Sequence, residues 1–368
     1  MKINTYYPEN LTDLGSSLWF ELLRVKRKAE KGSVASGQKQ ILEQMRFVDS
    51  MEEASLCILP MDWNYYFQHK KIKPAKEFVE QAASKGKIIF SSTSGDSGIS
   101  VNVPMNCWVY RISGYRSTMR KNERPHPYFL SDPIEVFFKN QEQKVVKKNT
   151  DHQPVVGFCG MAPDDLLTWT IEPLRILLKN WQRKLKLHPF DQQKVMSSSR
   201  LRVRTLQQFQ SNNHFTTNFI IRKKYRAGAT TAADKKKTTL EYYNNQFESD
   251  FNICVRGGGN FSARFYETLA MGRIPVFVDT DTPLPDITPH NWDDHMVRCH
   301  VKDLGNITQI INNWIKDKEI NQLFRKNRVL WKEHLSFQGF FFFYIKLFLQ
   351  QLHNMDQFND KRSTVVGM

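Results

Sequence analysis

Apolar and polar residues follow two alternating patterns along the chain. Short apolar runs, several of them rich in β-branched residues, are separated by longer segments in which apolar residues recur every three or four positions. The runs predict buried strands, the longer segments predict amphipathic helices, and strands that alternate with helices favour parallel sheets. The predicted strands are 56–60, 88–91, 109–112, 154–160, 251–255 and 274–278, and the predicted helices are 74–85, 165–187, 262–271, 306–316 and one from 321 into the 330s.

A change in composition divides the chain. Residues 140–153, NQEQKVVKKNTDHQ, are polar and charged with few large apolar side chains, which predicts an interdomain linker or an exposed hairpin. We therefore expect an N-terminal α/β domain over 1–150 and a C-terminal α/β domain over 151–335. A helical tail is expected over 336–368, with a disordered end because polar termini are rarely held in place. Residues 227–237, AGATTAADKKK, predict a mobile loop because they lack large apolar side chains.

The most informative segment is 251–279, FNICVRGGGNFSARFYETLAMGRIPVFVD. It predicts a strand, a glycine loop at Gly257–Gly259, a helix and a second strand. Glycines let backbone N–H groups approach a ligand closely, and the N-terminus of a helix attracts anions. Arg264 lies in the first turn of the predicted helix, where its planar guanidinium can grip phosphate oxygens. Glu267 lies one turn deeper, where its carboxylate can accept both hydroxyls of a ribose; a surface Arg–Glu pair beside an ordinary glycine turn is the alternative.

Composition narrows the class of protein. The chain has 368 residues, of which 40% are hydrophobic, and this suits a folded protein of two domains. No uncharged apolar stretch reaches the ~20 residues of a spanning helix. The N-terminus, MKINTYYPEN, lacks the apolar core of a signal peptide. Five cysteines stand apart without a C-x-x-C pair, which indicates reduced thiols in the cytoplasm.

The chain is strongly basic, with 53 Lys and Arg against 37 Asp and Glu and a net charge of +16. This balance favours anionic partners such as nucleotides, phospholipid headgroups, acidic polysaccharide or nucleic acid. The basic residues are dispersed and form no stripe with interleaved aromatics, which argues against a nucleic-acid partner. The phenylalanines over 340–343 need burial, or a partner or membrane surface. Peripheral contact with an anionic membrane therefore stays open beside burial in the core.

Three linked motifs carry a family resemblance. In chain order they are Cys254-Val255-Arg256-Gly257, Ser262-x-Arg264-x-x-Glu267 and Gly272-x-Ile274-Pro275-Val276. This order resembles the exostosin-like glycosyltransferases, which form glycosyltransferase family 47. The resemblance is dense over 249–292, looser over 50–300, and absent from residues 1–50.

The resemblance implies an α/β fold of the GT-B type, in which two Rossmann-like domains with parallel sheets face each other across a cleft. The C-terminal domain would bind a nucleoside diphosphate sugar, with a UDP-sugar expected, and the N-terminal domain would bind a glycan or lipid-linked acceptor. Family members act with inversion and generally need no metal, so neither a cofactor nor a metal is expected. The chain is thus expected to be a cytoplasmic enzyme of polysaccharide biosynthesis that transfers a hexosyl or pentosyl group.

By position in the motifs, the resemblance also assigns roles to residues. Arg264 would hold the diphosphate of the donor, and Glu267 would hold the ribose. Ser262 would cap the helix or contact phosphate. The phosphate side would be lined by Arg256 and by the backbone of Gly257, Gly258 and Gly259.

A general base is needed as well, because inverting transfer requires a group that takes the proton of the acceptor hydroxyl near neutral pH. Asp96 is the first candidate, since it lies on a glycine-flanked loop after a predicted strand, where the sites of α/β proteins gather. Asp62, which follows the predicted strand 56–60, is the second candidate. An Asp between Gly95 and Ser97 is also an ordinary turn residue.

Rival interpretations stay open. Gly257-x-Gly259-x-x-Ser262, with Asp279 at the end of the next strand, approaches the fingerprint of an NAD(P)-dependent oxidoreductase, although Ser replaces the third glycine. Asp279-Thr280-Asp281 is a DxD sequence that can hold a divalent ion against a diphosphate. A basic nucleic-acid-binding protein is the non-enzymatic alternative. A metal cluster is also conceivable, but the spacing of its candidate ligands matches no standard site; these are His290, Asp293, Asp294, His295, Cys299 and His300.

Overall fold

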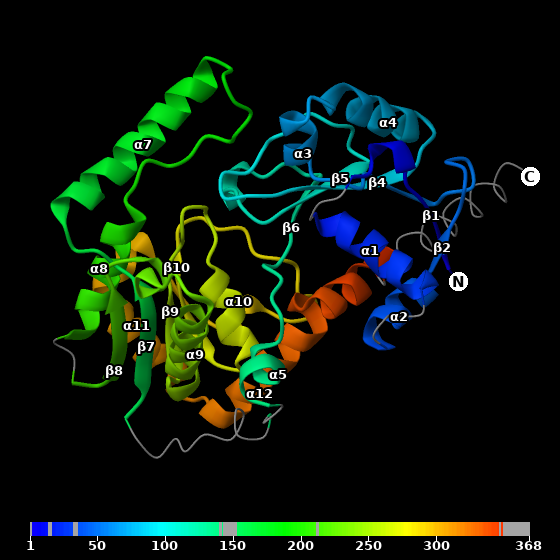
Figure 1. Ribbon diagram of the computed structural model, residues 1–368. Coiled ribbons are helices and arrows are strands. Elements are labelled where there is room, and N and C mark those ends of the chain that lie inside the picture. Colours follow the sequence, from blue (N-terminus) through cyan, green and yellow to red (C-terminus); the bar gives the residue numbers. More distant parts are fainter. Residues whose placement is uncertain are drawn as a thin grey trace, which may run out of the picture. The chain divides into compact units, whose positions relative to one another are not determined.

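The computed structural model describes residues 2–13, 17–31, 36–139, 142, 153–210, 213–345 and 347–348 (Figure 1). Contacts between residues divide the chain into two compact units. The first unit combines Met1–Ser92, Asn102–Tyr110 and the segment from Glu333 onward. The second unit combines Thr93–Val101 with Arg111–Lys332.

The domain borders expected from composition remain predictions. By contacts, the described residues over 111–139 group with the second unit. The expected linker over 140–153 lies almost entirely outside the described residues, and so does the tail beyond 348, where disorder is expected.

The first unit combines a parallel sheet with helices. The order of its strands is β2-β1-β3-β4-β5, and the registers of β1 with β2, β1 with β3 and β3 with β4 are parallel. The strands are β1 (Ile3–Tyr6), β2 (Met45–Phe47), β3 (Leu56–Ile58), β4 (Ile88–Thr93) and β5 (Cys107–Arg111). A further short strand, β6 (Glu123–Pro125), belongs to the residues that group with the second unit. The helices are α1 (Leu18–Glu30), α2 (Ser36–Glu43), α3 (Trp63–Gln68) and α4 (Ile72–Ser84).

The phenylalanines near the C-terminus lie in the core of the first unit. Residues 337–345 are helical. The ring of Phe341 packs edge-on against Trp19 with 5.5 Å between centroids, and the ring of Phe340 packs edge-on against Tyr110 with 6.1 Å between centroids. Phe340 and Phe341 are 0% and 2% exposed. Burial therefore accounts for these two side chains.

The second unit contains a five-stranded sheet with the order β11-β10-β9-β7-β8, in which every neighbouring pair is parallel. The strands are β7 (Val155–Met161), β8 (Thr216–Arg222), β9 (Phe251–Cys254), β10 (Ile274–Asp279) and β11 (Val297–His300). The helices are α5 (Pro133–Phe137), α7 (Leu166–Lys184), α8 (Ser198–Gln210), α9 (Ala232–Glu248), α10 (Ala263–Ala270), α11 (Ile307–Ile315) and α12 (Ile320–Leu330). Every residue of β9 and β10 is buried, as expected for parallel strands covered on both faces.

A glycine determines where α10 ends. Gly272 follows the helix with φ of +64°, the left-handed conformation that glycine adopts at helix ends. A Cβ atom at this position would lie 2.8 Å from the carbonyl oxygen of Phe324 on α12. Because both the backbone angle and the space exclude a side chain, Gly272 lets α10 pack closely against α12 before the chain enters β10.

These elements confirm the predicted fold class, an α/β protein with two Rossmann-like units built on parallel sheets. The strand–loop–helix–strand order predicted for 251–279 is observed as β9, the glycine loop, α10 and β10. None of the helices in the described residues is long and apolar enough to cross a membrane.

The prediction of a mobile loop over 227–237 is wrong from Ala232 onward, where α9 begins. Thr231 caps this helix, because its hydroxyl accepts a hydrogen bond from the backbone N–H of Asp234 at 3.1 Å. Its hydroxyl also donates to the Asp234 carboxylate at 2.7 Å. This reciprocal cap stabilises a helical start that contains few apolar residues.

Candidate functional site

The second unit contains a cavity of about 470 Å³ where β7, β8 and β9 end. Ligands of α/β proteins bind at the carboxyl ends of parallel strands. The lining brings together seven residues singled out in the sequence, which are Asp96, Gly257, Gly258, Gly259, Ser262, Arg264 and Glu267. It also includes residues that sequence reasoning gave no role, among them Tyr128, Arg202, Arg222, Tyr225, Arg226, Tyr242 and Phe261.

The glycine loop after β9 is shaped by the segment that packs against it. A Cβ atom on Gly258 would lie 2.8 Å from an Asp96 carboxylate oxygen, and one on Gly259 would lie 2.6 Å from the Asp96 carbonyl oxygen. Both distances are shorter than real Cβ atoms show. At Gly259 the close atoms belong to the backbone, so this position has no room for a side chain, whereas at Gly258 the close atom is the end of the Asp96 side chain, which can move. A Cβ atom on Gly257 would meet its nearest neighbour only at 4.0 Å. Two of the glycines thus allow Asp96 to lie directly against the loop.

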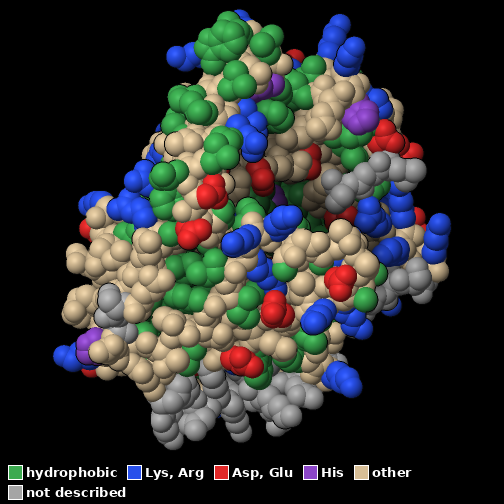
Figure 2. Space-filling model, turned by 60° about the vertical axis from the view of Figure 1, so that its left-hand side comes forward, with side chains coloured by type: hydrophobic (Ala, Val, Ile, Leu, Met, Phe, Trp, Pro, Cys, Tyr) green, Lys and Arg blue, Asp and Glu red, His purple; other side chains and the backbone are tan. Residues whose placement is uncertain are grey.

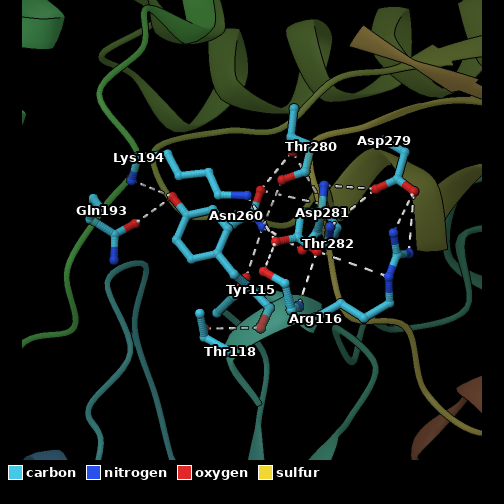
Figure 3. Close-up of polar contacts among 12 residues, drawn as sticks. Tyr115, Arg116, Thr118, Gln193, Lys194, Asn260, Asp279, Thr280, Asp281 and Thr282 are labelled. Carbon is cyan, nitrogen blue, oxygen red and sulfur yellow. Dashed lines mark hydrogen bonds and ion pairs between the residues drawn. The ribbon is translucent and has the colours of Figure 1, made fainter. Parts of the chain in front are cut away.

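Asn260 fixes the end of the loop before α10. Its side-chain amide donates to the carbonyl oxygens of Gly114 at 2.8 Å and Asp281 at 3.1 Å, and its side-chain oxygen accepts from the Thr280 hydroxyl at 2.6 Å (Figure 3). Asn260 is 0% exposed. These bonds hold the loop in place whether or not a ligand is bound.

Arg264 lies in the first turn of α10 and is held on several sides. It donates to the carbonyl oxygens of Cys159 at 2.7 Å and Ile253 at 3.2 Å, which are the ends of β7 and β9. Its guanidinium lies over the ring of Phe158 at 4.2 Å from the centroid. A Cβ atom on Gly160 would come within 2.5 Å of this guanidinium, so glycine at that position makes room for it.

The guanidinium of Arg264 keeps donors for a ligand. Arginine has five N–H groups. One on each of its nitrogens is used by the protein, with Nε donating to the Tyr242 hydroxyl at 3.3 Å. Each terminal nitrogen therefore retains a second N–H group, and Arg264 is one of the residues that line the cavity. A charged fork that is already oriented loses little entropy when it binds an anion.

Glu267 lies on the same side of α10, one turn after Arg264. Its carboxylate accepts the hydroxyl proton of Tyr242 in a hydrogen bond. Burial raises the pKa of Glu267, and the contacts with Tyr242 and Arg264 only partly oppose this shift. The carboxylate is therefore oriented toward the cavity by a tyrosine, and it gains a proton at a higher pH than an exposed glutamate does.

Further arginines give the cavity a positive character. Arg202, Arg222 and Arg226 line it together with Arg264, whereas the carboxylates in the lining are those of Asp96 and Glu267. Arg202 donates to the carbonyl oxygen of Met161 at 2.9 Å, and burial lowers its pKa to about 10, so it stays charged at neutral pH. The excess of cations suits a ligand that carries more than one negative charge.

Arg256 and Ser262, which the resemblance assigns to the phosphate side or to the helix cap, differ in how they relate to the cavity: Ser262 lines it and Arg256 does not. Arg256 is not part of the cavity lining: it is 3% exposed and lies behind the loop, where it donates to the Gly258 carbonyl oxygen at 3.3 Å and to the Tyr115 hydroxyl at 3.2 Å. Ser262 is the N-cap residue of α10, but its side chain makes no capping hydrogen bond. Ser262 is one of the lining residues, at the end of the helix where the first N–H groups lack partners within the helix.

The two candidates for the general base lie in different units. Asp96 lines the cavity, and its backbone carbonyl accepts a hydrogen bond from the Ser113 hydroxyl at 2.6 Å. Asp62 belongs to the first unit, at the N-terminus of α3. It is 4% exposed, and its carboxylate accepts the hydroxyl proton of Ser92 in a hydrogen bond. Of the two, Asp96 lies against the glycine loop and shares the cavity lining with Arg264.

The two carboxylates of the DxD sequence, Asp279 and Asp281, form ion pairs with basic side chains of the protein. Arg116 contacts Asp279 at 3.2 Å, and Lys194 contacts Asp281 at 2.8 Å (Figure 3). Arg298 also contacts Asp279 at 3.2 Å. Burial alone would raise the pKa of Asp279, but the arginines and a backbone N–H outweigh it and hold this pKa below its usual value. These carboxylates therefore form an ion-pair network that joins β10 to residues 116 and 194.

Comparisons with known proteins add little to this geometry. No family model matches the sequence, and no curated protein is significantly similar to it. The solved structures with a similar fold include a glycosyltransferase from Rickettsia africae ESF-5, with 12% identity, a TM-score of 0.37 and coverage of 96% of this chain and 99% of that chain. Another is Anabaena HepE in complex with UDP, with 10% identity, a TM-score of 0.35 and coverage of 97% of this chain and 100% of that chain. At such values neither similarity bears on what this chain does.

Proposed function

We propose that this chain is a glycosyltransferase that takes a sugar from a nucleoside diphosphate sugar. The observation that carries the proposal is the pairing of Arg264 and Glu267 on the first turns of α10, in a cavity that also holds the glycine loop. A fixed guanidinium beside a helix N-terminus suits a diphosphate, and a buried carboxylate one turn deeper suits the two hydroxyls of a ribose.

The transfer would proceed with inversion, in line with the resemblance of the motif to exostosin-like enzymes. The oxygen of the acceptor hydroxyl attacks the anomeric carbon while the bond from that carbon to the diphosphate breaks. The electron pair leaves with the nucleoside diphosphate, where Arg264 and the backbone of Gly257, Gly258 and Gly259 balance the charge. Asp96 takes the proton of the acceptor hydroxyl. Arg256 acts from behind the loop by fixing the Gly258 carbonyl.

The remaining parts of the proposal rest on the sequence. The donor is a UDP-sugar with a hexosyl or pentosyl group, and the acceptor is a glycan or lipid-linked chain in polysaccharide biosynthesis. A cytoplasmic location agrees with the five cysteines, all of which are free and buried. An oxidoreductase is less well supported, because the ion pairs of Asp279 with Arg116 and Arg298 occupy the carboxylate that a dinucleotide ribose would need.

A nucleotide screen by thermal shift tests the proposal, with every ligand measured with and without EDTA. UDP is expected to raise the melting temperature, because a ligand that binds only the folded state stabilises it. The shift and the sugar transfer should both survive EDTA, since Arg264 and the loop amides supply positive charge without a metal. Stabilisation by NAD(P) alone would favour the oxidoreductase. Loss of turnover with EDTA and recovery with manganese would favour a metal at Asp279 and Asp281.

Glu267→Gln is expected to weaken UDP binding by about tenfold while the fold is retained, because glutamine keeps the shape but loses a charge-assisted acceptor. In the parent, the affinity for UDP should fall on acidification, because only the ionised carboxylate accepts both hydroxyls. The fall should begin at a higher pH than for an ordinary glutamate, because the pKa of Glu267 is raised. In the variant this pH dependence should be lost.

Titration calorimetry with UDP across pH measures both effects. Glu135→Gln is the matched control, because Glu135 is an exposed glutamate on α5 that does not line the cavity. If the two variants bind UDP equally well, Glu267 does not contact the ribose.

A further inference from the structure

Helix α7 in the second unit exposes a large apolar surface. Not one of its residues is buried. Sixteen large hydrophobic side chains are exposed in the described part of the chain, and half of them lie on this helix or just after it. They are Leu166, Leu167, Leu174, Leu177, Leu178, Trp181, Leu185 and Leu187. On the face that Figure 2 brings forward, apolar side chains gather beside Lys and Arg. An apolar patch of this kind marks an interaction surface.

The apolar residues of α7 share one side of the helix. On a helical wheel, those from Leu166 to Trp181 fall within an arc of roughly 120°. The opposite side holds the helix to the rest of the unit. Trp169 donates to the carbonyl oxygen of Pro163 at 2.9 Å, and Glu172 accepts from the hydroxyls of Ser197 at 2.7 Å and Ser199 at 2.6 Å. The helix is therefore anchored through its polar side, and its apolar side is left uncovered.

Most of the charges around the apolar side are basic. Arg175 lies beyond one edge of it, Lys184 borders the other edge, and both are exposed. Two exposed aspartates, Asp164 and Asp165, stand just before the helix. Glu172 is the acidic residue of this helix, and it faces the serines of the unit rather than solvent. Leucine and tryptophan flanked by lysine and arginine form the pattern of a helix that lies in a membrane interface. Anionic headgroups complement the basic borders.

We propose that α7 binds the surface of an anionic membrane. Leu174, Leu177 and Trp181 enter the boundary between headgroups and acyl chains, while Arg175 and Lys184 lie level with the lipid phosphates. A second copy of the chain fits this surface less well, because α7 and the residues just after it expose more basic than acidic side chains, so that two-fold pairing on the same face brings like charges together. The proposal does not depend on the reaction proposed above.

Co-sedimentation of the whole chain with vesicles tests the proposal. Binding is expected to vesicles that contain phosphatidylserine, to be weaker to phosphatidylcholine alone, and to decrease with added salt. The triple variant Leu174→Ser, Leu177→Ser, Trp181→Ser should bind roughly a hundredfold more weakly or worse. The double variant Arg175→Gln, Lys184→Gln should lose roughly tenfold, and only for the anionic vesicles.

A matched control replaces exposed valines elsewhere. Val136 and Val329 are 57% and 49% exposed on α5 and α12, so Val136→Ser with Val329→Ser should leave vesicle binding unchanged. The α7 variants should keep the melting temperature and the UDP affinity of the parent, which separates this proposal from the reaction at the cavity. Equal vesicle binding by parent and triple variant overturns the proposal. A large loss of stability in the triple variant also overturns it, because the chain itself would then cover this face. A dimer of the parent that dissociates in the triple variant overturns it as well, because a second copy would then be the partner.

Discussion

Arg264→Ala is expected to lower kcat/KM for sugar transfer by roughly 10²–10³, the loss seen when one preorganised donor to a developing negative charge is removed. The guanidinium is fixed by Cys159, Ile253 and Tyr242 before a ligand arrives, so its remaining N–H groups are oriented for the diphosphate at no further cost. Charge builds on the diphosphate as the bond to the sugar breaks, and the contact should therefore strengthen in the transition state. The effect should fall on kcat as well as on UDP affinity.

Stability measurements separate this catalytic role from a structural one. The alanine variant also loses two hydrogen bonds to backbone carbonyls, each worth about 1 kcal/mol, so its urea midpoint should decrease modestly. Arg264→Lys should recover part of the affinity but not the rate, since an ammonium cannot keep the bonds to both strands and also grip the phosphate. Arg204→Ala is the control, because Arg204 is an exposed arginine on α8 outside the cavity. Unchanged kinetics in Arg264→Ala would remove this residue from the site.

The fold could be predicted from the sequence where local signals agree. The runs over 251–255 and 274–278 are apolar throughout, and a glycine stands at each turn between them. A buried parallel strand consists of consecutive apolar residues because both of its faces are covered. The start of α9 was missed because its signal is a cap, Thr231 with Asp234, in a segment of low apolar content. A helix cap is formed by neighbouring residues in the sequence, but a prediction based on apolar content does not detect it.

The candidate site could be predicted only where its residues share one element. Arg264 and Glu267 lie on α10, and helical spacing alone places them together. Arg202 and Arg222 reach the same cavity from α8 and from the end of β8, and no sequence pattern joins these elements to α10. The ion pairs of Asp279 were likewise hidden, since one of its cations, Arg116, lies far away in the sequence. Residues from different elements meet only in the folded chain, and no periodic pattern in the sequence indicates that they do.

Asp96→Asn is expected to lower kcat by roughly 10²–10⁴, the usual contribution of a general base, while UDP affinity and stability remain those of the parent. Asparagine keeps the shape that Gly258 and Gly259 accommodate, but it cannot take a proton. The Asp96 carboxylate is exposed and makes no hydrogen bond with the described residues, so its replacement should not disturb the loop.

Asp62→Asn provides the matched comparison at the other candidate. Its carboxylate is buried and bound to the Ser92 hydroxyl, so this variant should lose stability but keep its turnover per folded molecule. Measuring kcat and the urea midpoint for both variants distinguishes the two aspartates, because a base changes the rate and a structural carboxylate changes the midpoint. Normal turnover in Asp96→Asn, together with a stable but inactive Asp62→Asn, would assign the proton transfer to Asp62. The short distance between Asp96 and the glycine loop would then have only a packing role, since Gly258 and Gly259 accommodate its backbone and carboxylate in either case.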